Sequence, residues 1–75
     1  MKLSDLKPGD RVRCDFWVGD GETPCVPRDA VRVVRQDAAG LFVRCCGPAD
    51  CREWQTHHLD GQEDDDGELI GVTRA

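Results

Sequence analysis

Leu3–Trp17, L-S-D-L-K-P-G-D-R-V-R-C-D-F-W, is the stretch that decides how the fold begins. Proline fixes φ at about −65° and glycine accepts positive φ, so 7–10 (K-P-G-D) suits a tight turn with Pro at its second position. After this turn the pattern alternates, with Val12, Cys14 and Phe16 on one side and charged residues between them. A period of two is typical of a β-strand with one buried and one wet face.

The rest of the chain divides into short β-type segments separated by turn residues. Two Gly and two Pro predict a long loop at 18–29, and Gly40 ends a tight turn at 37–40. A second tight turn is expected at 47–50, and the segment 56–60 is too short for an α-helix but suits one turn of 3-10 helix. The strands predicted after the first are Ala30–Gln36, Leu41–Cys46, Cys51–Gln55 and Glu68–Thr73.

This order of elements predicts an all-β fold. We expect a five-stranded, mostly antiparallel small barrel with one short 3-10 turn before the last strand. In the order of its elements, the chain resembles the Src-homology-3-like (SH3-like) small barrels, including the KOW-type domains, over residues 3–74. In those folds a long loop joins the first two strands, and the run L-K-P-G-D-R-V at 6–12 is similar to the entry to their first strand. The resemblance implies one SH3-like barrel domain over residues 1–75.

Strand parity predicts which side chains form the core. Val34, Phe42 and Cys46 are apolar but alternate onto the face opposite to the predicted core residues. A strand that bends at a barrel corner buries both of its faces there, which accounts for Val34 and Phe42. A chain of 75 residues obtains only about 3–5 kcal/mol from one core and has little room for a deep substrate pocket. The core predicted from parity consists of Leu6, Val12, Cys14, Phe16, Val31, Val33, Leu41, Val43, Cys45, Trp54, Leu59, Ile70 and Val72.

Composition limits the classes of function. No apolar run approaches the ~20 residues of a membrane helix or the ~7–15 of a signal-peptide core, so we expect a cytoplasmic protein with no membrane partner. The five cysteines are an odd number in a reducing compartment, which disfavours a disulfide framework. We expect no cofactor.

The net charge of −5 is concentrated in one segment. Residues 60–68 hold six acids and no base, whereas the other residues carry nine acids and ten bases. Such a row of carboxylates presents phosphate-like charge to a basic protein surface, or else it is a solvated loop that keeps a small barrel soluble. The segment lacks EF-hand spacing, which leaves only loose calcium binding. The predicted partner-binding residues are Asp60, Glu63, Asp64, Asp65, Asp66 and Glu68, with Trp17 as an aromatic anchor and Asp20 and Glu22 from the long loop.

These features predict a small acidic, non-enzymatic binding module that acts through protein–protein contacts. Such a module would suit a phage or mobile-element accessory protein that blocks a nucleic-acid-handling protein by charge mimicry. An enzyme is disfavoured, because no pocket-forming insertion accompanies Cys51 and either His57 or His58, which are the candidate nucleophile and base.

Two other functions stay open. The first is a nucleic-acid-binding small barrel, although its net charge is acidic, whereas strong nucleic-acid binders usually show a basic footprint. It would use a stripe of outward arginines: Arg11, Arg13, Arg32, Arg44 and Arg52. The second is a zinc-binding Cys/His mini-domain, for which the spacing of the ligands is only a partial match. Its candidate ligands are Cys46, Cys51, His57 and His58.

Overall fold

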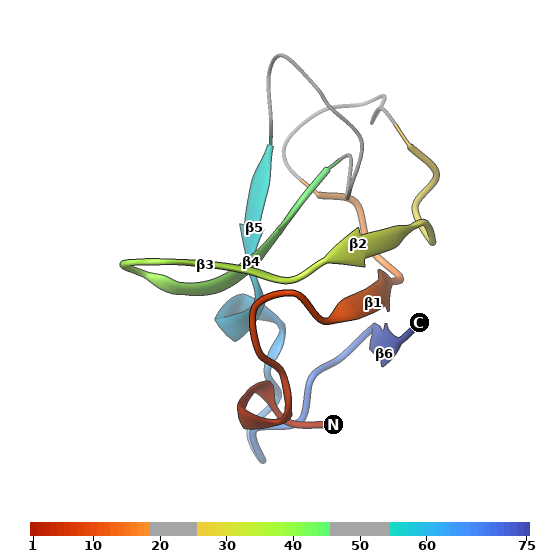
Figure 1. The fold of residues 1–75 in the computed structure, drawn as a ribbon. Helices are drawn as coiled ribbons and strands as arrows, with labels where there is room; N and C mark the ends of the chain where they lie inside the picture. The colour runs from red at the N-terminus through yellow and green to blue at the C-terminus, as the bar shows by residue number, and fades with distance from the viewer. Residues whose placement is uncertain (19–25, 46–54) are drawn as a thin grey trace.

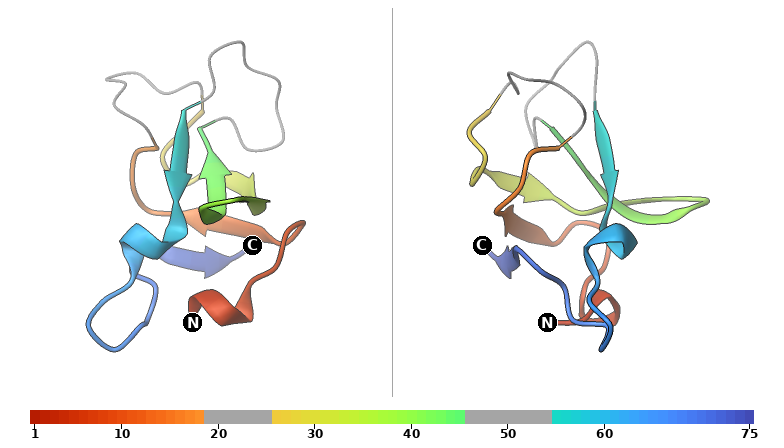
Figure 2. Two further views of the ribbon diagram at one scale, coloured as in Figure 1. Left: turned by 90° about the vertical axis from the view of Figure 1, so that its left-hand side faces the viewer. Right: turned by 180° about the vertical axis from the view of Figure 1, so that it is seen from behind.

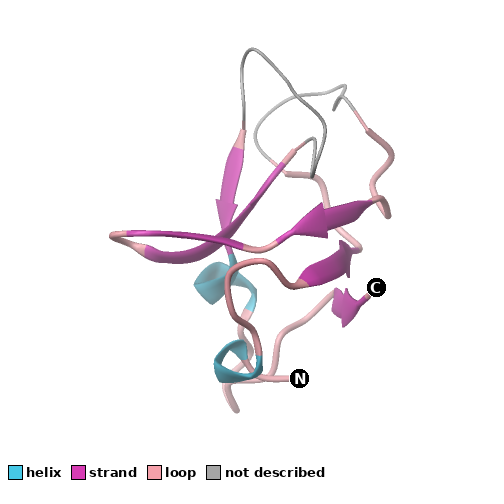
Figure 3. Ribbon diagram, viewed as in Figure 1, coloured by secondary structure: helices cyan, strands magenta, loops and turns pink. Residues whose placement is uncertain are grey.

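The structure is a computed structural model of the chain, and it describes residues 1–18, 26–45 and 55–75. This part of the chain contains strands and two short 3-10 helices but no α-helix, which confirms the all-β prediction (Figures 1 and 3). None of its helices has the length and apolar character needed to cross a membrane. The elements are η1 (Leu3–Asp5), β1 (Arg11–Cys14), β2 (Val31–Val33), β3 (Arg35–Asp37), β4 (Gly40–Arg44), β5 (Thr56–His58), η2 (Leu59–Gln62) and β6 (Val72–Arg74).

The strands form two antiparallel three-stranded sheets, in the orders β2-β1-β6 and β3-β4-β5. The predicted strand Ala30–Gln36 is in fact two strands, β2 and β3, which lie in different sheets and are separated only by Val34 (Figure 1). Two backbone hydrogen bonds of 2.8 Å hold this bend, because Val34 donates to the carbonyl of Asp10 and accepts from the amide of Gly9. The prediction of a five-stranded small barrel is therefore corrected, because the described part of the chain has six strands in two sheets that do not close into a barrel.

The two turns that lie within the described residues are confirmed. In the first, the amide of Asp10 donates to the carbonyl of Lys7 at 3.1 Å, and Gly9 has a φ of 96°, which favours glycine. In the second, one carboxylate oxygen of Asp37 accepts from the amides of Ala39 and Gly40 and closes the β3–β4 hairpin. Both turns are set by residues within four positions of one another, so the sequence alone predicts them.

The elements after residue 55 are displaced from their predicted places. Residues 56–58 form β5, which pairs with β4, and the 3-10 helix begins only at Leu59, although it still precedes the last strand as expected. The last strand is shorter than predicted, because Gly71 has a φ of 74° and β6 begins after it. The predicted turn at 47–50, the strand Cys51–Gln55 and the core residue Trp54 lie outside the described residues.

One hydrophobic core is built from both sheets and from η2. Phe16 and Leu41 are only partly buried but pack against it. Val34, at the bend, is buried in the core, as the corner explanation predicts, whereas Phe42 is buried on β4 outside the core cluster. The predicted core residues that the structure confirms as buried are Leu6, Val12, Cys14, Val43, Cys45, Leu59 and Val72.

Three core predictions are wrong. Val31 and Val33 are only partly buried and do not belong to the core cluster, because Arg32 pairs with the buried Val12, and residues directly opposite in an antiparallel pair share a face. Ile70 is 58% exposed, whereas its neighbour Leu69 is buried. The backbone sets this register, because the amide of Leu69 donates to the carbonyl of Met1 and that of Ile70 to the carbonyl of Gln62.

Candidate functional site

The acidic segment 60–68, here called the acidic turn, has a backbone fixed by its own residues. The Asp64 carboxylate accepts hydrogen bonds of 2.9 Å from the amides of Asp66 and Glu68. The backbone of Asp64 also bonds to Glu68 and to Gly67, at 2.8 and 3.0 Å. Aspartate commonly shapes turns in this way. Asp64 therefore organises the turn, and its carboxylate is engaged inside it.

A second acid of the turn is also engaged, because Glu68 Oε2 lies 2.6 Å from the amino nitrogen of Met1. The remaining four acids of the turn have exposed side chains. Among the described residues, no lysine or arginine forms an ion pair with any of these four. The acids that are open to a partner are therefore Asp60, Glu63, Asp65 and Asp66.

Trp17, the predicted aromatic anchor, is 48% exposed and follows β1. Figure 2 places the backbone of 16–18 (orange) well above the acidic turn (blue), which lies at the lower end of the molecule in both views. Its neighbours point inward, since Val18 is buried and Phe16 packs on the core. The structure therefore does not bring Trp17 and the acidic turn onto one surface, and Asp20 and Glu22 lie outside the described residues.

The two histidines of the predicted zinc site point to opposite faces of β5. His57 lies against the Phe16 ring, with centroids 4.7 Å apart, and its Nε2 is 3.0 Å from Nε2 of Gln62. His58 Nε2 lies 3.0 Å from both carboxylate oxygens of Asp37. Adjacent strand residues cannot ligate one ion from opposite faces. Within the described ranges no three His, Cys, Asp or Glu side chains are arranged to hold a metal ion, while Cys46 and Cys51 fall outside them.

The environment of His57 favours its neutral form. Burial lowers its pKa, the neighbouring His58 lowers it further, and Asp60 acts in the opposite direction. The contact with Gln62 agrees with this, because a neutral imidazole nitrogen accepts a hydrogen bond from the amide whereas a protonated one does not. His57 is thus a partly buried packing residue that resists protonation in the folded state.

We expect the lowered pKa of His57 to make stability depend on pH. The unfolded chain takes up a proton near the ordinary histidine pKa of about 6.5. The contribution of His57 to the free energy of unfolding is therefore fully present above about pH 6.5 and is lost as the pH falls through the lower pKa of the folded state. Urea unfolding at several values between about pH 7.5 and 5.5 should show a decline that His57→Gln reduces. A matched His58→Gln variant should keep most of the decline, because burial is the larger cause of the lowered pKa of His57. An unchanged decline in His57→Gln would contradict the assignment.

Cys14 is a core residue and not a nucleophile. Burial raises the pKa of its thiol, and the nearby Arg32 only partly offsets this effect. Cys45 is buried as well. A protonated, buried thiol such as that of Cys14 is inert in the chemistry that reactive cysteines perform.

The predicted arginine stripe is not one surface. Arg11 and Arg13 are exposed on β1 in one sheet, whereas Arg44 lies on β4 in the other. Arg32 is 0% exposed, which corrects its predicted outward position, and Arg52 is outside the described residues. Sequence reasoning also missed Arg35, which lies opposite Phe42. The pairing of Arg35 with Phe42 could have been predicted from the sequence, because a tight hairpin turn at 37–40 fixes which residues of the two strands lie opposite each other.

An open groove of about 560 Å³ lies beside β6 and η1. It is lined by Met1, Asp5, Val72, Thr73 and Arg74. Arg74 crosses it to bond the carbonyl of Asp5 and to pair with Asp10 at 3.4 Å. None of the predicted site residues lines this groove.

Comparisons with protein-family models, with curated proteins and with solved structures give no match to this chain. What its described residues offer to a partner is an acidic turn with four open carboxylates.

Proposed function

We propose that this chain is a small non-enzymatic binding module whose acidic turn docks on a basic protein surface. The observation that supports this is the preorganised display of the carboxylates of Asp60, Glu63, Asp65 and Asp66 on a backbone held by Asp64. Like charges so close together repel one another, and a fixed backbone avoids the cost of ordering them when a partner binds. Charge displayed in this way increases the rate of association with a basic surface.

The partner class that we propose is a nucleic-acid-handling protein, blocked by charge mimicry. Carboxylates at short intervals along a turn imitate the charge of a phosphate backbone, and a site that binds nucleic acid offers lysines and arginines to such charge. A phage or mobile-element accessory protein of the cytoplasm would use a module of this kind.

The fold that we propose for the module is an open form of the SH3-like barrel. β2 and β3, which meet at Val34, together occupy the place of the second strand that the resemblance implies. β1 pairs with β6, the long connection at 18–29 joins the first two strands, and η2 precedes the last one. The long connection and the 3-10 helix before the last strand are features on which the resemblance to that class rests.

The test compares two double variants of equal charge. Asp65→Asn/Asp66→Asn removes two open carboxylates and leaves Asp64 in place, whereas Asp15→Asn/Asp29→Asn makes the same change of charge elsewhere on the surface. With labelled deca-lysine as the probe, stopped-flow fluorescence at about 50 mM salt should show about tenfold slower association for the first variant. The second variant should stay within about twofold of the wild type.

The salt dependence of the association rate provides a second test with the same two double variants. Above about 0.3 M salt the Debye length falls to about 5–6 Å, so the two variants and the wild type should converge. An equal decrease of the association rate in both double variants would show that only the net charge of the chain matters. No loss in either would remove the acidic turn from the contact surface.

A further inference from the structure

The outward face of the β2-β1-β6 sheet carries two arginines and is here called the arginine face. Arg11 and Arg13 are two residues apart on β1, so their side chains leave the same face of the sheet about 7 Å apart. Strand pairing places Val33 beside Arg11, and Val31 and Thr73 on the two sides of Arg13. Both arginines and the threonine are exposed, and the two valines are only partly buried. The arginine face, made of these five residues, is thus open to solvent.

The charges on the arginine face are not neutralised. No carboxylate of the described residues forms an ion pair with Arg11 or Arg13, and Asp15, two residues further on, is paired with Arg28 at 3.3 Å. Within the same ranges the Arg11 side chain makes no hydrogen bond, and Arg13 makes one long bond of 3.5 Å to the backbone carbonyl of Asp29. Two cations about 7 Å apart lie within one Debye length at physiological salt, so they repel each other. An acidic partner at this face would relieve the repulsion.

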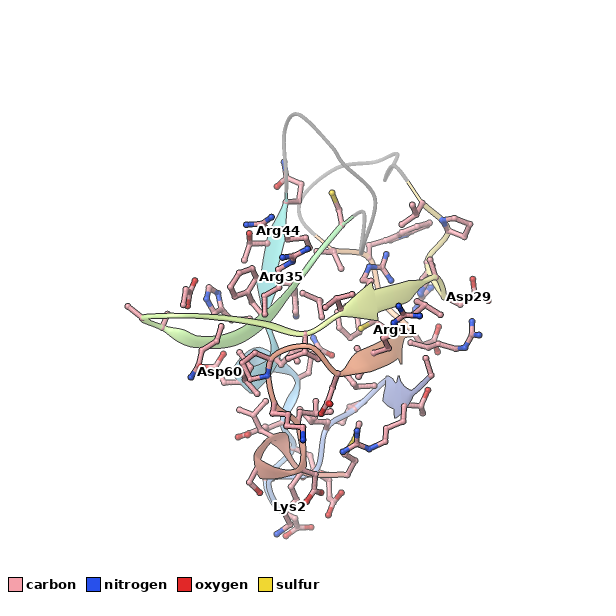
Figure 4. All side chains as sticks on the ribbon, viewed as in Figure 1. Lys2, Arg11, Asp29, Arg35, Arg44 and Asp60 are labelled. Atoms are coloured by element: carbon pink, nitrogen blue, oxygen red, sulfur yellow. The ribbon has the colours of Figure 1, made fainter. Side chains whose placement is uncertain are left out.

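The same chain carries the complementary charge on a different side. Figure 4 shows Arg11 and Asp29 on the right of the molecule and Asp60 of the acidic turn on the left. Both surfaces are fixed by backbone hydrogen bonds, the arginine face by the pairing of β1 with its two neighbours and the acidic turn by Asp64. One chain therefore cannot place its own acidic turn on its own arginine face without opening the fold. Two copies can bring these surfaces together.

The distribution of charge along the chain allows such a contact despite the net charge of −5. Residues 60–68 hold six acids and no base, whereas the other residues carry nine acids and ten bases. Repulsion between two copies therefore arises mainly between their acidic turns. In a head-to-tail arrangement the acidic turn of one copy faces the nearly neutral body of the next, where it meets the two open arginines.

We propose that the acidic turn of one copy docks on the arginine face of a second copy. A guanidinium binds a carboxylate through two parallel hydrogen bonds, and the turn offers four open carboxylates to two such groups. The contact joins two different surfaces, so each pair leaves one of each surface free and the assembly extends with concentration. A single turn buries little area, which makes the contact weak and reversible.

Self-association of this kind would regulate access to the acidic turn. It occupies the same carboxylates that the proposed function presents to a basic protein, so a second copy and that protein compete. The inference goes beyond the proposed function, because it assigns a role to the arginine face, which that function does not use.

The experiment measures the weight-average mass by sedimentation equilibrium. At about 50 mM salt we expect a Kd of about 0.1–1 mM, so a solution of about 1 mM protein should show at least about twice the mass of one chain. Above about 0.5 M salt the Debye length falls to about 4 Å, and the mass should return to that of one chain. A wild-type protein that stays monomeric at low salt would overturn the proposal.

Two double variants test the surfaces by complementation. Arg11→Gln/Arg13→Gln and Asp65→Asn/Asp66→Asn should each self-associate about tenfold more weakly than the wild type. In an equal mixture the first variant supplies the acidic turn and the second supplies the arginine face. The mixture should therefore regain the wild-type affinity but stop at a pair of one copy each. A mixture that associates no better than its components would contradict the head-to-tail contact.

Matched controls separate these surfaces from the net charge. Lys2→Gln/Lys7→Gln removes two exposed cations elsewhere, and its self-association should stay within about twofold of the wild type. Asp15→Asn/Asp29→Asn removes two acids outside the acidic turn and should not weaken self-association. A loss in the lysine control equal to that in the arginine variant would show that only the net charge acts.

A conservative variant guards against misfolding. Arg11→Lys/Arg13→Lys keeps both charges and loses the planar fork, so it should self-associate about threefold to fivefold more weakly with the salt dependence preserved. Circular dichroism of each variant confirms that the sheets are intact.

Other occupants of the arginine face are distinguished with labelled deca-glutamate and oligo-thymidylate. If either probe binds this face while the wild-type chain stays monomeric, the occupant is an acidic peptide or a nucleic acid and the proposal is wrong. Failure of the proposed function is a separate result, because Arg11→Gln/Arg13→Gln leaves the acidic turn intact. Its association with deca-lysine should stay within about twofold of the wild type even though its self-association is lost.

Discussion

Replacing Arg32 by alanine is expected to lower the free energy of unfolding by about 3–5 kcal/mol, which is as much as one core of this size supplies in total. The Arg32 side chain is completely buried in the β2-β1-β6 sheet. Its guanidinium donates to three backbone carbonyls of the segment that leads into β2: Pro27 at 3.4 Å, Arg28 at 2.9 Å and Ala30 at 3.3 Å. Truncation to alanine leaves both a cavity and these carbonyls without their donors, and each effect is destabilising.

A set of variants separates the two effects in urea unfolding. Arg32→Met fills most of the space without donating hydrogen bonds, so its cost should be smaller, about 1–3 kcal/mol, and it should remain folded. Arg11→Ala lies on the same sheet but is exposed, and it should change stability by no more than about 0.5 kcal/mol. If Arg32→Met and Arg11→Ala were equally mild, Arg32 would lie at the surface, as strand alternation alone predicts.

In β2 the side chains that face the core are the opposite of those predicted, which shows why alternation alone does not predict the buried face of a short strand. Val31 and Val33 outnumber Val34, so counting apolar residues predicts that the first two face inward. The structure instead places Val34 and Arg32 inward, because Val12 fixes the face of its partner Arg32. The carbonyls of Pro27, Arg28 and Ala30 accept hydrogen bonds from the two terminal nitrogens of Arg32, although its Nε has no acceptor among the described residues. Hydropathy measures the cost of burying arginine but carries no information about acceptors that the fold brings to it.

Local signals were predictive and long-range ones were not. The turns at 7–10 and 37–40 depend on Pro, Gly and Asp at fixed offsets, and both are present where they were expected. Residues 56–58, predicted as the start of a 3-10 turn, instead form β5 by pairing with β4, and Ile70, predicted as core, is exposed. Both outcomes depend on pairing with segments far along the chain. The same division holds at the candidate site. Composition located the acidic turn, but only the hydrogen bonds separate Asp64, which shapes it, from the acids that are open to a partner.

The second large effect is expected at Leu59, the first residue of η2, where the chain leaves β5 for the acidic turn. Its side chain has no exposed surface and belongs to the core cluster, and η2 contacts β4 as well as β5. Both sheets contribute to the core around it, so little room exists for the neighbours to collapse into a cavity. Leu59→Ala should therefore lower the free energy of unfolding by about 3–5 kcal/mol, at the upper end of the range for such truncations.

Ile70 provides the control for Leu59, because both are large aliphatic residues in the C-terminal segment and parity predicts both to be core. Ile70→Ala should cost no more than about 1 kcal/mol, since most of its side chain is already in water. Leu59→Met conserves volume and should cost less than about 1.5 kcal/mol, so it remains folded if the alanine variant does not. Urea unfolding followed by far-UV circular dichroism measures all three. A larger loss for Ile70→Ala than for Leu59→Ala would reverse the register of the last segment, and with it the path of the chain that holds the acidic turn.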